Sequence, residues 1–141
     1  MWYYKGEHFD SIGDYVGFVY VITNTVDNRK YIGKKNFYFS RSKQVKGKKK
    51  RLKVESDWKD YYGSNKELSA DVERLGKENF KREILMLCKS KGDFAYYEAK
   101  FQFDNNVLES NDYYNSWIMC RIHKRHLTFS KRVDSIQAMP Q

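Results

Sequence analysis

Two extended segments joined by a short polar turn constrain the fold of this chain most. Residues 17–23, with the sequence GFVYVIT, are rich in β-branched and aromatic side chains and are typical of a buried strand. The turn-forming residues NTVDN follow at 24–28, and RKYIG at 29–33 resumes an extended pattern. The sequence therefore predicts a β-hairpin over these residues.

Downstream segments alternate between helical and extended patterns. Ser64 and Glu67 have the spacing of a capping box, and Gly76 is suited to end the helix that they begin. A strand, a second helix and a last extended segment follow at 80–88, 94–103 and 114–122. This order predicts the α+β class, as a small antiparallel β-sheet flanked by helices.

A chain of 141 residues is expected to form one domain. We predict an N-terminal extension at 1–16 that lies on the domain, a folded domain at 17–122 and a polar, basic C-terminal tail at 123–141. No apolar run reaches ~18 residues and no secretory signal is visible, so a membrane span is not expected. The two cysteines, Cys88 and Cys120, are too few for a disulfide framework and favour a reducing, cytoplasmic setting.

The charge of the chain points to a polyanionic partner. Lysine and arginine number 27 against 18 acidic residues, and 17% of the residues are aromatic. Phosphate neutralisation and base stacking use these two residue types, so nucleic acid fits better than a membrane surface. Residues 41–53 hold eight cations and no acid, and predict a basic arm that either contacts phosphates or only keeps the chain soluble. These cations are Arg41, Lys43, Lys46, Lys48, Lys49, Lys50, Arg51 and Lys53.

The hairpin residues resemble a known paired motif. Phe18-Val19-Tyr20, followed after ten residues by Tyr31-Ile32-Gly33 and Lys34, resembles the motif of the GIY-YIG nucleases. Phe-Val-Tyr stands here in place of Gly-Ile-Tyr, with the tyrosine retained. A glycine-ended helix, a strand, Glu98 on the next helix and Tyr114-Asn115 follow in the family's order. The resemblance covers about residues 17–118 and is strongest toward small homing-type and phage members.

This resemblance implies a single-domain endonuclease that hydrolyses phosphodiester bonds of duplex DNA with Mg²⁺ or Mn²⁺ and without a small-molecule cofactor. Tyr20 would take the proton of the attacking water, helped by Lys34, whose ammonium is expected to lower the pKa of a neighbouring phenol. Tyr31 would position water or phosphate. Glu98 would bind the metal, and Asn115 would orient the site by hydrogen bonds.

Glu98 is also unusual in the helical pattern. Phe94, Glu98 and Phe101 share one face at 3.6 residues per turn, which aligns a carboxylate with aromatics that should point inward. A lone carboxylate there costs several kcal/mol unless it is paired or metal-bound. The two interpretations are an ion pair with a lysine or arginine, and a single divalent metal completed by waters and phosphate oxygens.

The arginine of the family has two candidates in this chain. Counting eight residues beyond the second motif reaches Arg41, whose guanidinium would bind the scissile phosphate. Because the basic arm resembles an insertion, Arg51 is the alternative. Position 45 is Val where relatives carry His or Tyr, and Tyr61 or Tyr62 could take that role.

A zinc site is not expected. Cys120-x2-His123-x2-His126 matches no standard spacing and lacks a firm fourth ligand. Two other functions stay open. One is a non-catalytic, basic nucleic-acid-binding protein that uses the same surface, and the other is a nuclease that acts on branched or RNA substrates.

Overall fold

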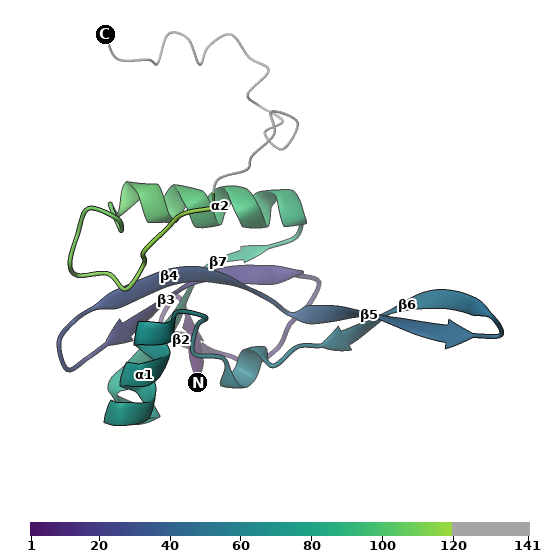
Figure 1. Cartoon of the computed structure of the whole chain (residues 1–141), viewed down its shortest axis with the longest axis horizontal. Coiled ribbons are helices and arrows are strands. Elements are labelled where there is room, and N and C mark those ends of the chain that lie inside the picture. The colour runs from purple at the N-terminus through teal and green to yellow at the C-terminus, as the bar shows by residue number, and fades with distance from the viewer. Residues whose placement is uncertain (120–141) are drawn as a thin grey trace, which may run out of the picture.

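A five-stranded sheet in the order β2-β1-β7-β3-β4 forms the centre of the computed structural model, which describes residues 1–119 (Figure 1). The predicted hairpin is confirmed, since β3 and β4 pair antiparallel. The α+β class is confirmed as well. The sheet is mixed rather than wholly antiparallel, because β1 runs parallel to β7. Its strands are β1 (Trp2–Tyr4), β2 (Glu7–Phe9), β3 (Gly17–Asn24), β4 (Lys30–Asn36) and β7 (Phe80–Cys88).

The N-terminal residues are built into this sheet rather than lying on it as an extension. β1 and β2 continue the sheet beyond β7. Trp2 is 1% exposed, and its indole Nε1 donates to the carbonyl of Trp58 at 2.6 Å. Burial of this one large side chain stabilises a strand of only three residues, which is too short to give a sequence pattern.

The helices cover both sides of the sheet (Figure 1). On the α2 side, Phe94 packs with Val19 and Ile32 in the smaller core. On the α1 side, Leu68 packs with the larger, aromatic core that contains Tyr20. The alternation of strand side chains thus sends neighbouring residues of β3 into different cores. The helices are α1 (Lys66–Leu75) and α2 (Lys91–Asp104), and the short 3-10 helices in the described range are η1 (Trp58–Asp60) and η2 (Lys77–Asn79).

α1 begins one residue later than the capping-box spacing predicts. Asn65 is the N-cap, and its side chain accepts from the backbone N–H of Leu68 at 2.9 Å. Ser64 instead lies 3.2 Å from the hydroxyl of Tyr31. Gly76 ends the helix as predicted, with a φ of 92° that side chains rarely adopt.

The basic arm is a second β-hairpin. β5 (Tyr38–Val45) pairs antiparallel with β6 (Lys48–Glu55), and the two strands extend away from the rest of the molecule (Figure 1). Every residue of β6 is exposed. The base of the arm is closed by Ser56, whose N–H donates to the carbonyl of Phe37 at 2.8 Å and whose hydroxyl donates to that of Asn36 at 2.6 Å.

The segment predicted at 114–122 has no regular strand up to residue 119, the end of the described range, and an isolated bridge joins Tyr113 to Lys30. Cys120, His123, His126 and the tail at 123–141 lie outside the described residues. Within that range, no helix has the length and apolar character needed to cross a membrane.

Candidate active site

Three phenols meet on the α1 side of the β3–β4 hairpin. The ring centroid of Tyr20 lies 6.2 Å from that of Tyr31 and 5.9 Å from that of Tyr61. Tyr20 stands opposite Gly33 in the register, and a Cβ at Gly33 would come within 2.6 Å of the Tyr20 hydroxyl. The last residue of the Tyr-Ile-Gly motif is therefore glycine because a phenol lies directly over its backbone.

The phenols of Tyr20 and Tyr31 stay protonated at neutral pH. Burial raises the pKa of Tyr20 well above the ordinary phenol value, and Tyr61, Tyr31 and Glu98 act in the same direction. Burial also raises the pKa of Tyr31. The expectation that a lysine lowers the pKa of the Tyr20 phenol is wrong, because desolvation outweighs any cation near it.

Strand alternation separates the two lysines that follow the motif. The Lys34 ammonium lies on the α2 side, 3.9 Å from the Glu98 carboxylate. The Lys35 ammonium lies on the phenol side, 4.1 Å from the ring centroid of Tyr61 and 2.6 Å from a carboxylate oxygen of Asp57. Lys35 was missed by sequence reasoning, although counting every second residue from the motif tyrosine identifies it.

A cavity of about 130 Å³ lies at the edge formed by β4, the last strand of the sheet. The hairpin, the start of α1, the inner face of α2 and the segment after α2 all contribute to its wall. The structure thus brings together Tyr31, Glu98 and Asn115, which were predicted from separate parts of the sequence. The lining residues are Tyr31, Ser64, Asn65, Glu98, Gln102, Asn115, Ser116, Trp117 and Met119.

Asn115 binds the free edge of β4 as another strand would. Its Oδ1 accepts from the N–H of Ile32 at 3.0 Å, and its Nδ2 donates to the Ile32 carbonyl at 2.8 Å. Gln102 donates to the same carbonyl at 2.9 Å. The Oε1 of Gln102 is buried and has no hydrogen-bond partner among residues 1–119. Both amides therefore bind the motif backbone, and the Gln102 amide leaves its buried acceptor unused.

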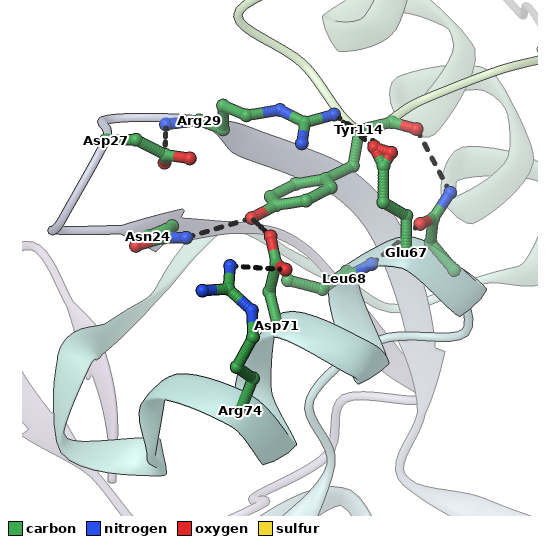
Figure 2. A network of polar contacts seen from close by, with 9 residues as sticks. Asn24, Asp27, Arg29, Glu67, Leu68, Asp71, Arg74 and Tyr114 are labelled. Carbon is green, nitrogen blue, oxygen red and sulfur yellow. Dashed lines mark hydrogen bonds and ion pairs between the residues drawn. The ribbon is translucent and has the colours of Figure 1, made fainter.

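A polar network fixes the residue before Asn115 (Figure 2). The Tyr114 hydroxyl accepts from Asn24 at 3.0 Å and donates to Asp71 at 2.7 Å. The guanidinium of Arg29 lies 4.0 Å from the Tyr114 ring centroid and also binds Glu67 on α1. Burial, together with the Asp71 carboxylate, raises the pKa of Tyr114 to about 12. The network holds the hairpin turn, α1 and the segment after α2 in one arrangement.

The residues of the cavity fit a hard divalent cation. Among the described residues, no three His, Cys, Asp or Glu side chains come together as a metal site. Glu98, Gln102 and Tyr31, whose side chains carry oxygen atoms, nevertheless line one cavity, which has room for roughly four waters. Mg²⁺ keeps most of its waters and needs few protein ligands. Burial raises the pKa of Glu98. The Lys34 ammonium and a hydrogen bond from the Lys34 backbone N–H act in the opposite direction and lower it.

The two candidate arginines lie on the arm. Arg41 is in β5 and Arg51 in β6, both exposed, and these strands extend away from the rest of the molecule (Figure 1). The structure also separates the two candidate tyrosines. Tyr61 lies beside Tyr20, whereas the Tyr62 ring packs 4.1 Å from the guanidinium of Arg82.

Comparisons with known proteins agree with the sequence motif. Residues 2–118 match the family model described as "Putative endonuclease segE, GIY-YIG domain". The "Putative endonuclease segE" of Enterobacteria phage T4 is 29% identical over 99 residues, which are 70% of this chain and 39% of that protein. The chain therefore spans less than half the length of this relative. No solved structure gave a significant match.

Proposed function

The chain belongs to the GIY-YIG endonuclease family, and we propose from this that it hydrolyses phosphodiester bonds of duplex DNA with the help of Mg²⁺ or Mn²⁺. The observation that carries the proposal is the cavity at the edge of β4, where Tyr31 from the hairpin and Glu98 from α2 face the same space. Because its relative is a phage protein, we place the reaction in the cytoplasm of a host cell. The chemistry needs no small-molecule cofactor.

In the proposed reaction, a water oxygen bonds to phosphorus as the bond to the 3′ oxygen breaks, which leaves a 5′-phosphate and a 3′-hydroxyl end. The Tyr31 hydroxyl orients this water. Tyr20 accepts the proton of the water when it is ionised. Because its pKa is raised, only a small fraction of Tyr20 is ionised at neutral pH, and the fraction grows tenfold with each pH unit.

Glu98 would hold the metal ion, and Gln102, one turn further along α2, lines the same cavity. A bound divalent ion supplies positive charge that stabilises the leaving oxygen and the phosphoryl group. Lys34 balances the carboxylate charge when no cation is present. Asn115 positions the cavity wall through its two hydrogen bonds to Ile32.

We assign the phosphate-neutralising role to Lys35 rather than to Arg41 or Arg51. Lys35 contacts the ring of Tyr61, and its side chain is 11% exposed, so its charge acts in a partly desolvated place. Arg41 lies six residues further along an extended chain, as much as ~20 Å away at the usual rise of a strand. Asp57 holds the ammonium until phosphate replaces it.

Cleavage of plasmid DNA in Mg²⁺ or Mn²⁺ tests the proposed function. Glu98→Gln should lose at least ~100-fold in rate, the size expected for loss of a group that binds charge in the transition state, while DNA binding persists. Glu73→Gln is the matched control, because Glu73 is an exposed glutamate of α1 outside the cavity. A wild-type protein that binds DNA but cuts nothing with either metal would favour the non-catalytic alternative.

A single-turnover comparison tests which basic side chain neutralises the phosphate. With protein in excess over DNA, Lys35→Ala should slow cleavage ~100-fold while the DNA remains fully bound. Arg41→Ala should weaken binding at raised salt and leave the saturated rate within a few-fold. The reverse result would return the role to Arg41. A panel of duplex, branched and RNA substrates, run in parallel, identifies which nucleic acid is cut.

A further inference from the structure

The arm formed by β5 and β6 has the dimensions of a DNA-reading ribbon. Each strand has eight residues, or ~26 Å at the usual rise. The major groove of B-DNA, about 12 Å wide, admits a two-stranded β-ribbon, whereas proteins that use the minor groove, about 6 Å wide, commonly bend or kink the duplex. Building on the proposed action on duplex DNA, we propose that the arm enters the major groove and reads base edges with one of its two faces.

The arm is formed before any partner arrives. The turn residues Lys46 and Gly47 both have positive φ, 50° and 77°, which is the conformation of a two-residue type I′ turn. The twist of this turn matches that of the strands, so it sustains a regular ribbon. A ribbon that is already ordered binds at a lower entropic cost than a loop.

The positive charge of the arm favours binding to a polyanion. Residues 38–55 contain eight cations and one acid, so the arm carries +7 of the net +9 of the chain. The acid, Glu55, lies at the base and accepts from the indole of Trp58 at 3.3 Å. Five of the eight cations lie within residues 48–53, and such a block of like charges repels itself. A phosphate backbone on either side relieves this repulsion.

Strand alternation gives the arm two chemically different faces. On the polar face, Tyr38 pairs with Glu55 at the base, and beyond it each hydroxyl or amide residue of β5 pairs with a cation of β6. These residues are Ser40, Ser42, Gln44, Lys49, Arg51 and Lys53. On the mixed face, cations alternate with exposed apolar side chains, among them Phe39, Leu52 and Val54. These apolar residues lie near the base, where the ribbon leaves the domain.

The polar face is the one suited to base edges. Arginine and lysine bind guanine O6 and N7, glutamine binds adenine N6 and N7, and serine bonds to either. Leu52 and Val54 offer no hydrogen bond. We therefore assign the polar face to the floor of the groove. Lys46, which is exposed at the tip of the arm, is assigned to the phosphate backbone of the DNA.

Methylation interference distinguishes the grooves, because dimethyl sulfate modifies guanine N7 in the major groove and adenine N3 in the minor groove. The DNA substrates would be duplexes that the full chain selects from a random pool. Binding is measured in EDTA, because the assay does not require cleavage. We expect guanine N7 methylation to weaken binding at defined positions. Interference confined to adenine N3, or none at either atom, would overturn the proposal.

Uncharged variants then identify the face. Ser42→Ala combined with Gln44→Ala should remove part of the interference pattern without changing the dependence of binding on salt. Leu52→Ala, on the mixed face, is the matched control and should leave the pattern intact. A change with Leu52→Ala but none with the double variant would overturn the assignment of the face. Because binding is measured without metal, failure of cleavage and failure of groove reading are separate results.

Discussion

Two β-hairpins follow one another in this chain and differ in almost everything except their pairing. The β3–β4 hairpin is packed on both sides by separate cores, and its turn is held by the network around Tyr114. In the β5–β6 hairpin, Tyr38 at the base packs against the larger core, whereas every residue of β6 is exposed and the strands are held by their own ladder and turn. The comparison shows that one motif can be fixed by packing or left to extend: packing fixes the side chains of the proposed site, whereas the arm has the reach and charge for the proposed contact with DNA.

The glycines of the two hairpins give the largest expected contrast. Gly33→Ala would place a Cβ 2.6 Å from the Tyr20 hydroxyl and 2.9 Å from the Tyr31 ring, so the phenols must move. We expect a loss of ~1000-fold in cleavage rate and about 1–3 kcal/mol of unfolding free energy. Gly47→Ala meets no atom within 4 Å and strains only its own turn. Equal effects of the two substitutions on cleavage would break the comparison.

Removal of the arm should affect binding and spare the fold. Replacing residues 41–52 by Asn-Gly joins Ser40 to Lys53, which face each other in the ladder, through a favoured two-residue turn. We expect binding at 150 mM salt to weaken ~100-fold and the salt dependence to become shallower, because fewer counterions are released. The thermal unfolding midpoint should stay within a few degrees. A large loss of stability would mean that the arm is part of the core.

The pH dependence of the cleavage rate should reveal the ionisation of Tyr20, which is buried in the β3–β4 hairpin. Because burial raises the pKa of Tyr20 well above its ordinary value, the fraction able to accept a proton rises ~10-fold per pH unit. The single-turnover rate should therefore climb from pH 6 to pH 9 without a plateau, and Tyr20→Phe should remove the dependence. A plateau near neutral pH would show that another group is the base.

Lys34 should set the acidic limit of activity. Its ammonium lowers the Glu98 pKa that burial raises, and the metal needs the ionised carboxylate. In Lys34→Met the pKa of Glu98 rises further, so metal-dependent cleavage should fail at a higher pH than in the wild type. Lys48→Met, on the arm, should leave this limit where it is. An unchanged limit in Lys34→Met would mean that Glu98 does not titrate in the reaction.

The smallest effect is expected at Tyr114. Tyr114→Phe removes the hydrogen bonds to Asn24 and Asp71 and should cost about 1–2 kcal/mol. Because the pKa of Tyr114 is about 12 in the fold, the unfolded chain releases a proton above pH ~10 that the folded chain keeps. Stability should then fall by up to ~1.4 kcal/mol per pH unit, and less steeply in the variant. Denaturant unfolding at several pH values measures the stability lost in Tyr114→Phe and the change of stability with pH. Tyr38→Phe, on the arm, is the control.

The features that the sequence predicted correctly are those with long, regular patterns. The β3–β4 hairpin and the Gly76 helix end depend on neighbouring residues, so local reasoning finds them. β1 was missed because three residues give no periodicity, and Lys35 was missed because proximity in sequence was preferred to strand alternation. The arm inserts residues after the motif, which breaks the spacing that pointed to Arg41.

Contacts between residues that are far apart in the chain leave no recognisable pattern in the sequence. Tyr114 and Asn24 are 90 residues apart, and nothing in either segment indicates that they share a hydrogen bond. The choice of Tyr61 over Tyr62 depends in the same way on which neighbour faces Tyr20. Such pairings are decided by packing in three dimensions, which a single sequence does not record.

The narrow base of the arm has an evolutionary consequence. The short stretch at Asn36, Phe37 and Ser56 joins the arm to the domain. A hairpin of another sequence could be recombined at this junction without altering the cavity at the edge of β4. Under the proposed role of the arm, the same junction offers a grafting point at which target preference could be reprogrammed while the proposed catalytic residues are inherited unchanged.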